Sequence, residues 1–231
     1  MSERYRLLFL LLVVVSASFT FINSVFFLIS DITFKGNKSL SGEELLMISN
    51  IGERANFFRL DEKVIAKNLE EHPIIRKAVV HKLFPSSLKI EIEERIPRAV
   101  LPKEGHFVEI DNEGVAIRFT RSLDDAMPII TGIDTSVLTL GEQVQTPGLE
   151  GALEIIVNLS EDTRKELSEI NLTVPIDIRM YTIDGLKIYI GQAERLANKV
   201  RVLESILKNI DEKGLKVEYI DVRYENAPVV K

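Results

Sequence analysis

The residues of this chain whose types and spacing could carry out acid–base chemistry are the carboxylates Glu91, Glu93 and Glu94. A pair of carboxylates can act as general acid and general base when both face one cleft. Glu91 and Glu93 lie in a segment, residues 88–93, in which apolar and charged residues alternate strictly. A strand would therefore place both carboxylates on its solvent face. We expect them to be solvated surface groups, not a catalytic pair.

Other reactive residue types are scarce. The chain has no cysteine, which excludes disulfides, thiolate metal sites and a cysteine nucleophile. Its three histidines, His72, His81 and His106, lie far apart and leave little material for a zinc centre. The sequence contains no phosphate-binding glycine loop, nucleophile elbow or His-Glu-x-x-His motif. We predict that the protein is not an enzyme and that it uses no cofactor or metal.

Composition narrows the function classes further. The 231 residues are 45% hydrophobic and 28% charged, enough for one large or two small folded domains and unlike a disordered chain. The formal net charge is −6. A protein that binds the phosphates of nucleic acid needs a basic surface, so we expect no nucleic-acid partner. The absence of catalytic motifs also argues against a small-molecule substrate.

The stretch from Leu7 to Ile29 holds 23 consecutive residues without a charge. As a helix it would be about 34 Å long, which is enough to cross a bilayer core of about 30 Å. We predict a tail over residues 1–6 and a transmembrane helix over residues 7–29. Val15-Ser16-Ala17 also looks like a signal-peptidase site, so cleavage after Ala17 remains an alternative. The apolar character continues well beyond Ala17, which favours an uncleaved anchor.

The predicted orientation of this helix rests on the positive charge of the amino terminus and on the sizes of the two flanking segments. Arg4 and Arg6 precede it, and Lys35 and Lys38 follow it, so the nearby positive charges tie. A tail of six residues is too short to fold, and the working part must follow the membrane helix. We predict a single-pass protein of the cell inner (plasma) membrane, with a cytoplasmic N-terminus and an extracytoplasmic C-terminal region.

The segment after the membrane helix, residues 31–99, has the pattern of a small β-α-α-β-β domain. Residues 32–34 alternate as a short strand and run into a turn. Ser41 and Glu44 have the spacing of a capping box at the start of a first helix. Asp61 is expected to cap a second helix, in which Val64, Ile65 and Leu69 face the core.

Two strands complete this domain. Residues 75–83 are apolar and basic, Phe84-Pro85 opens a turn, and residues 88–93 alternate. Leu88, Ile90 and Ile92 would then face a core that the two helices cover.

Residues 100–231 predict a larger mixed α/β domain with an extended sheet, which makes the whole chain α+β. Its last strand, residues 217–224, would put Ile220, Val222 and Tyr224 on the core side and Arg223 on the solvent side. The other expected elements are hairpins at 106–119 and 176–190, an extended segment at 128–132, helices at 147–159, 161–167 and 194–210, and a short apolar segment at 227–231.

The order of these elements, and several phrases within them, resemble the FtsQ/DivIB family of bacterial cell-division proteins, which are single-pass membrane proteins with a POTRA domain. The phrases that carry the resemblance are His72-Pro-Ile-Ile-Arg-Lys-Ala-Val-Val80, Phe84-Pro85, Glu94-Arg-Ile-Pro-Arg-Ala99, Asp111-Asn-Glu-Gly114, Pro128-Ile-Ile-Thr-Gly132 and Ile220-Asp-Val-Arg-Tyr224. The resemblance covers almost the whole chain. It implies a POTRA-like domain at 31–99 and an FtsQ-type β domain at 100–231.

The resemblance also implies a function. The protein would be a non-enzymatic scaffold of the divisome, located at the division septum. It would bind FtsB-like and FtsL-like bitopic division proteins and link them to septal peptidoglycan synthesis. The short tail departs from many family members, so a role carried by a longer tail is not expected here.

The partner-binding mode implied by the family is strand addition at the C-terminal edge of the second domain. Arg223 and Tyr224 match the family's partner-contacting positions, and Arg223 would pair with an acidic residue of the partner. The residues expected to form the edge itself are Glu225, Asn226, Ala227, Val229 and Val230.

An alternative is that the POTRA-like domain acts as a chaperone or binding module for outer-membrane or secreted polypeptides. That role normally accompanies a β-barrel, and the sequence shows no series of alternating ten-residue segments. The division scaffold is therefore the preferred prediction.

Overall fold

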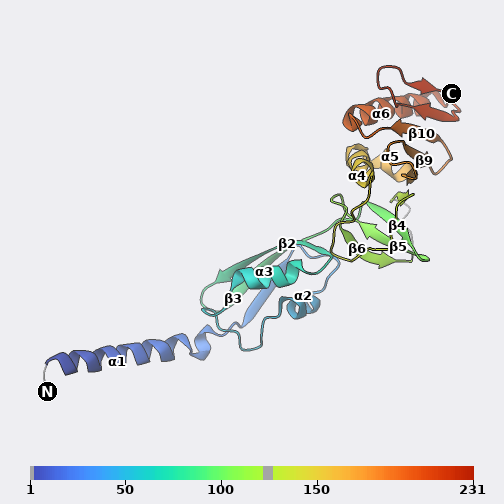
Figure 1. Cartoon of the computed structure of the whole chain (residues 1–231). Coiled ribbons are helices and arrows are strands. Elements are labelled where there is room, and N and C mark those ends of the chain that lie inside the picture. Colours follow the sequence, from blue (N-terminus) through green and yellow to red (C-terminus); the bar gives the residue numbers. More distant parts are fainter. Residues whose placement is uncertain (1–2, 122–126) are drawn as a thin grey trace. The chain divides into compact units, whose positions relative to one another are not determined.

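A computed structural model describes residues 3–121 and 127–231 (Figure 1). The chain divides into two compact units, Met1–Glu94 and Arg95–Lys231. This division falls a few residues before the predicted boundary at residue 99. The reason is local: Arg98 N–H donates to Ile110 O at 2.8 Å, and Arg95 pairs with Asp111 at 2.6 Å, so both belong to the second unit.

The apolar N-terminal segment forms α1 (Glu3–Ile22), a helix long and apolar enough to cross a membrane. The predicted helix extended to Ile29, which is too far. After Ile22 the chain turns into the 3-10 helix η1 (Val25–Phe27), and Phe27 is only 2% exposed. Ile29 N–H then donates to Ala55 O at 2.8 Å. The last apolar residues of the run therefore belong to the folded part of the first unit.

The first unit confirms the predicted β-α-α-β-β order (Figure 1). Among its described residues, one sheet has the order β1-β3-β2, with β1 parallel and β2 antiparallel to the central β3. The elements are β1 (Asp31–Lys35), α2 (Gly42–Ser49), α3 (Glu62–Glu70), β2 (Ile75–Leu83) and β3 (Ser87–Glu94).

The local patterns explain these elements. Leu88, Ile90 and Ile92 are buried on one face of β3, as the alternation predicts. The capping box at α2 is complete: Glu44 N–H donates to Ser41 Oγ at 3.2 Å, and Ser41 N–H donates to Glu44 Oε2 at 2.8 Å. Each contact satisfies a donor that the first helical turn leaves unpaired.

Helix α3 confirms one prediction and corrects another. Asp61 caps it by accepting from Lys63 N–H at 2.9 Å. Ile65 and Leu69 are buried, but Val64 is 54% exposed. Residues 65 and 69 are about one turn apart, whereas residue 64 is rotated by about 100° from residue 65 and faces solvent.

In the second unit, the described residues form a nine-stranded sheet in the order β12-β11-β10-β9-β8-β7-β4-β5-β6. Most neighbours are antiparallel, but β4–β7, β7–β8 and β10–β11 are parallel. The strands are β4 (Ala99–Lys103), β5 (His106–Ile110), β6 (Ala116–Thr120), β7 (Ile129–Thr131), β8 (Leu167–Asn171), β9 (Ile178–Thr182), β10 (Lys187–Gly191), β11 (Tyr219–Asp221) and β12 (Val229–Val230).

Three helices accompany this sheet: α4 (Leu149–Asn158), α5 (Glu161–Glu166) and α6 (Leu196–Lys213). The helix predicted at 194–210 is confirmed as α6, and its apolar stripe of Leu196, Val200 and Leu203 is buried in one cluster with the inner side chains of the strands. Helix α4 packs closely, because a Cβ at Gly151 would lie only 2.9 Å from the Cβ of Ala193. The core of the unit therefore lies between the sheet and helices α4 and α6.

The two edges of the larger sheet differ. At β6 the loop after β7 covers the beginning of the outer edge: Ala116 N–H donates to Glu142 O at 3.0 Å, and Gly141 N–H donates to Ala116 O at 2.8 Å. Val144 N–H also donates to Gly114 O at 2.9 Å. In the part of the chain that the structure describes, β12 pairs with β11 alone.

The turn between β5 and β6 is organised by Asp111, which is 1% exposed. Its Oδ1 accepts from the N–H groups of Glu113 and Val115, both at 2.9 Å. Its Oδ2 accepts from Arg95 Nη1 at 2.6 Å. One buried carboxylate thus satisfies two backbone donors and a cation.

We expect Asp111→Ala to destabilise the second unit by about 3 kcal/mol, because it leaves buried donors without acceptors. Denaturant unfolding of the purified protein in mild detergent measures this change. Glu150→Ala, at an exposed position of α4, is the control and should change stability by less than about 0.5 kcal/mol. Equal effects of the two substitutions would contradict the role of Asp111.

In the first unit, Glu94 binds the loop before α2. Its carboxylate accepts from the N–H groups of Lys38, Ser39 and Leu40 at 2.8 to 3.3 Å. Burial alone would raise the pKa of Glu94, but these hydrogen bonds outweigh it and hold the pKa below its usual value. The charged form is therefore the one that the fold favours.

Glu94→Gln should cost about 1 kcal/mol at neutral pH, a modest value because solvent screens this partly exposed group. Since the folded-state pKa is depressed, the contribution of Glu94 is complete above the unfolded pKa of about 4.3 and is lost as the pH falls through the folded value. Unfolding curves of wild type and variant should therefore converge as the pH falls below the depressed folded-state pKa. The control is Glu93→Gln, since the ion pair of Glu93 with Arg76 is exposed on both sides.

Candidate functional site

The last strand of the sheet, β12, forms its open edge. Tyr219 and Lys231 exchange two backbone hydrogen bonds, of 3.2 and 3.1 Å, and Ile220 and Asp221 stand opposite Val230 and Val229. In an antiparallel pair, the backbone groups of successive residues point alternately toward the partner strand and away from it. The pairing of Lys231 therefore turns the backbone of Val230 outward.

The outer side of β12 thus offers a short set of groups to an added strand. They are the N–H and C=O of Val230 and the C=O of Pro228, which has no N–H. A partner strand would have to donate to these two carbonyls and accept from one N–H. Val229 and Val230 are 49% and 44% exposed, so their side chains are also accessible.

Beside this edge, the solvent face of β9, β10 and β11 gathers charged and aromatic side chains. Tyr189 of β10 stands opposite Arg179 of β9 and Asp221 of β11. The guanidinium carbons of Arg179 and Arg223 lie 5.8 and 5.7 Å from the centre of the Tyr189 ring, within the range of a cation–π contact. The ring of Tyr219 also meets Tyr189 edge-on at 5.8 Å.

Arg223 is held in place by Asp221. Its Nε lies 3.0 Å from both carboxylate oxygens, and its Nη2 lies 2.6 Å from Oδ2. These hydrogen bonds lower the pKa of Asp221 and raise that of Arg223. The pair is therefore charged at neutral pH and fixes the guanidinium over the face of Tyr189.

Gly191 makes room for Arg223. The pairing of β9 with β10 shifts by one residue between Tyr189 and Gly191, which is a bulge, and Gly191 has a φ of +72°. A Cβ at this position would lie 2.8 Å from Cγ of Arg223. The bulge and the missing side chain together let the arginine cross the end of β10.

The residues between β11 and β12 form a turn, in which Ala227 N–H donates to Tyr224 O at 3.0 Å. Two predictions are corrected here. Tyr224 is 77% exposed and does not continue the core face of Ile220 and Val222, because the chain bends into the turn from Arg223 on. Glu225, Asn226 and Ala227 belong to the turn, so that the edge strand itself contains only Val229 and Val230.

Glu225 joins this turn to the start of α6. Its Oε1 lies 2.9 Å from Nη1 of Arg195, and its Oε2 is buried without a hydrogen-bond partner among the described residues. Arg195 is itself in the left-handed region, with a φ of +51°. The turn that carries Tyr224 is therefore fixed to the helix that crosses from β10 to β11.

A hollow of about 320 Å³ lies between this turn and α6, lined by Asp177, Lys199, Arg223 and Tyr224 among others. Lys199 is 5% exposed, and its Nζ donates to the carbonyls of Ile190 and Gln192 at 2.9 and 2.8 Å. Burial lowers the pKa of Lys199. Its two carbonyl contacts give this lysine a structural role at the end of β10.

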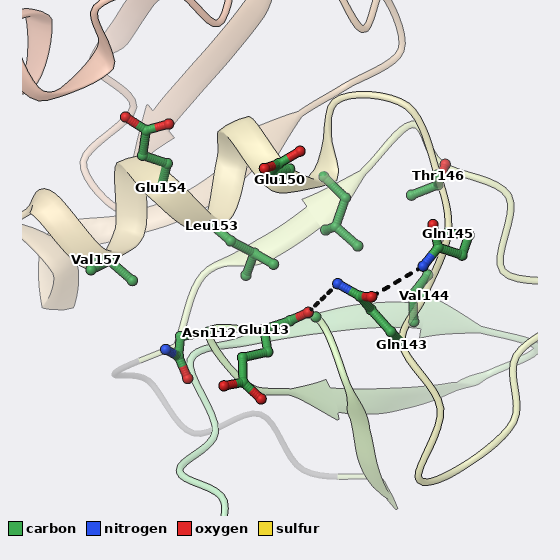
Figure 2. Close-up of a pocket in the computed structure, with 12 residues that line it drawn as sticks. Asn112, Glu113, Gln143, Val144, Gln145, Thr146, Glu150, Leu153, Glu154 and Val157 are labelled. Atoms are coloured by element: carbon green, nitrogen blue, oxygen red, sulfur yellow. Dashed lines mark hydrogen bonds between the residues drawn. The ribbon is translucent and has the colours of Figure 1, made fainter.

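A second hollow, of about 560 Å³, lies between α4 and the β5–β6 turn. Figure 2 shows Leu153 pointing from α4 toward this turn and Glu154 pointing away from it. Gln143 Nε2 donates to Glu113 O at 2.8 Å, and Gln145 Nε2 donates to Gln143 Oε1 at 3.1 Å. The described lining consists of carboxylates, amides, one threonine and aliphatic groups, which is not a nucleophile with its base.

The structure brings together the residues that the sequence singled out. It also places beside them residues that the sequence did not indicate. Arg223, Tyr224 and the two valines lie around one edge of the sheet. Arg179 and Tyr189 were missed, although both occupy outward positions of alternating strands. Only the pairing of β9, β10 and β11 shows that these positions converge.

Comparison with known proteins identifies the family of both units. Residues 27–95 match the POTRA domain, FtsQ-type, and residues 99–223 match the C-terminal domain of the cell division protein FtsQ/DivIB. The first match begins at Phe27, the residue at which the chain enters the folded part of the first unit.

Individual relatives agree. The cell division protein FtsQ of Syntrophotalea carbinolica is 28% identical over 222 residues, which cover 90% of this chain and 75% of the relative. The cell division protein DivIB of Clostridium tetani is 26% identical over 211 residues, which cover 89% and 79%. A solved structure, the major extracytoplasmic domain of DivIB from Geobacillus stearothermophilus, covers 54% of this chain and 99% of that domain, with 15% identity and a TM-score of 0.37. Since the match at residues 99–223 alone spans more than half of the 231 residues, the protein belongs to the FtsQ/DivIB family of cell-division proteins.

Proposed function

We propose that this protein is a non-enzymatic scaffold of the divisome that binds FtsB-like and FtsL-like bitopic proteins by strand addition at β12. The observation that carries the proposal is the difference between the two edges of the large sheet. Loop hydrogen bonds cover the beginning of β6, whereas no described residue pairs with the outer side of β12. Open edges invite pairing with another chain unless they are shielded.

The wider setting rests on the family. The FtsQ/DivIB match and the apolar α1 together indicate a single-pass membrane protein with a role in cell division. Within that setting we infer a cytoplasmic N-terminus, two extracytoplasmic units and a location at the septum. By holding its bitopic partners there, the protein would link them to septal peptidoglycan synthesis.

The side chains around β12 suit a partner segment of defined chemistry. The hydrogen bonds from Arg223 to Asp221 use Nε and Nη2, and the N–H groups of Nη1 donate to no described residue. A carboxylate of the partner could therefore bind Nη1 without displacing Asp221. Tyr224, 77% exposed, would supply a large apolar contact at the end of the added strand. Asn226 and Ala227, in the turn beside it, would line the same contact.

A backbone test separates strand addition from simple side-chain contact. A photo-crosslinker at Val229 should capture a small single-pass protein with a coiled-coil segment in the native host. Val230→Pro removes the outward N–H and should reduce capture about tenfold, since a partner carbonyl is left without a donor. Val230→Ala keeps the N–H and is the matched control, with capture expected within about threefold of the parent.

Equal capture by the two variants would exclude a backbone contribution of Val230. Capture of a β-barrel or of passing secretory chains would favour the chaperone alternative.

A side-chain test uses Tyr224→Asp. An exposed turn residue adds little to the fold, so the free energy of unfolding should change by less than about 0.5 kcal/mol. Binding should weaken at least about tenfold if Tyr224 packs in a dehydrated contact. Val137→Asp is the control: Val137 is 93% exposed and follows β7, five strands away from β12 in the sheet. Unchanged partner capture by Tyr224→Asp would count against this turn as part of the site.

A further inference from the structure

The first unit carries a cluster of aromatic side chains where α1 ends. Phe27, 2% exposed, lies at its centre. The rings of Phe26, Phe58 and Phe84 each contact that of Phe27, with centroids 5.0, 4.8 and 5.9 Å away. These rings come from three segments that are distant in the sequence: η1, the loop before α3 and the β2–β3 turn.

The outer rings of this cluster are exposed to a degree that is unusual for phenylalanine. Phe84 is 69% exposed, Phe26 57% and Phe58 49%. Val25 and Leu83, their neighbours in the chain, are 82% and 50% exposed. Contiguous apolar surface of this kind marks a contact with a lipid or protein surface rather than with water.

The position of the cluster indicates which surface it meets. Phe21, on the last turn of α1, contacts the ring of Phe27 at 5.2 Å. Asn56 Nδ2 donates to the carbonyl of Ile22, the last residue of α1, at 2.9 Å. Arg59 Nη2 donates to Asn23 Oδ1 at 2.5 Å. The patch is therefore continuous with the end of the helix that is apolar enough to cross a membrane.

Cationic side chains border the patch, as expected for a surface that contacts lipid headgroups. Lys82 lies above the ring of Phe57, with Nζ 5.1 Å from its centroid, and donates to Leu60 O at 2.8 Å. The exposed Arg59 lies next to Phe58 in the chain. Long cationic side chains beside aromatic rings suit the boundary between acyl chains and lipid phosphates.

We propose that Phe26, Phe58 and Phe84 insert into the interfacial layer of the same bilayer that α1 crosses, and that they hold the first unit against the membrane surface. Arg59 and Lys82 would then face lipid phosphates. The inference rests on α1 as a membrane helix and not on the partner edge at β12, so the failure of either proposal would leave the other standing.

Because the chain contains no cysteine, a single introduced thiol can be labelled without further changes. The full-length protein with Phe84→Cys, labelled with the fluorophore NBD, is reconstituted into phosphatidylcholine–phosphatidylglycerol vesicles. The control is Lys77→Cys, an exposed position on β2, the strand that ends just before residue 84, and about 23 Å from that residue at about 3.3 Å per residue. Phe58→Cys is a second test position, in case the label at the β2–β3 turn disturbs the fold.

We expect blue-shifted emission from labels at residues 84 and 58, and quenching by shallow doxyl-labelled lipid at least about threefold stronger than at residue 77. Far-UV circular dichroism of each variant checks that the fold is intact. Water-like emission at both test positions would overturn the proposal. Shifted emission without quenching by the doxyl lipid would overturn it as well, because a protein surface, either a second copy or another chain, would then cover the patch.

Discussion

The backbone N–H and C=O groups of a β-sheet need hydrogen-bond partners, and along the outer side of β12 no described strand provides them in the larger unit. Its nine described strands satisfy one another from β11 to β5, and loop hydrogen bonds shield the start of β6. Strand β12 remains. The parallel pairing of β10 with β11 requires a crossover, which α6 supplies, and the buried face of α6 supports the strands that lead to this edge.

The two surfaces proposed as contact sites differ in chemistry. The face beside β12 carries ion pairs and stacked rings, in which Arg223 is fixed by Asp221 over Tyr189. The charged groups of such a face can be hydrated when it is free, and they can discriminate between partners when a partner covers it. The end of the first unit instead exposes phenylalanine rings beside a membrane helix. A surface of that composition suits a permanent contact that keeps water away from the rings.

Much of this architecture could be predicted from the sequence because its signals are local. The capping box at Ser41 and Glu44, the alternation in β3 and the stripe of α6 each depend on residues a few positions apart. Strands β4 and β8 were missed: the first contains Pro102, and the second follows α5 without a break.

The features that sequence alone did not reveal depend on long-range pairing. The helix was predicted to reach Ile29 because hydrophobicity does not distinguish a lipid-facing residue from a core residue such as Phe27. The exposure of Tyr224 follows from the turn that begins after Val222. Likewise, the meeting of Arg179, Tyr189 and Arg223 depends on strand register, which no local pattern encodes.

The crossover through α6 has a consequence for the order of folding. Strands β11 and β12 are a local antiparallel pair, and they can join the sheet only after the chain between β10 and β11 has closed around α6. Non-local, parallel pairing is slow, since loop-closure entropy must be overcome first. The open edge is therefore expected to be among the last features of the second unit to join the sheet. A partner that recognises this edge would select molecules whose second unit is already complete, and association would itself act as a check on folding.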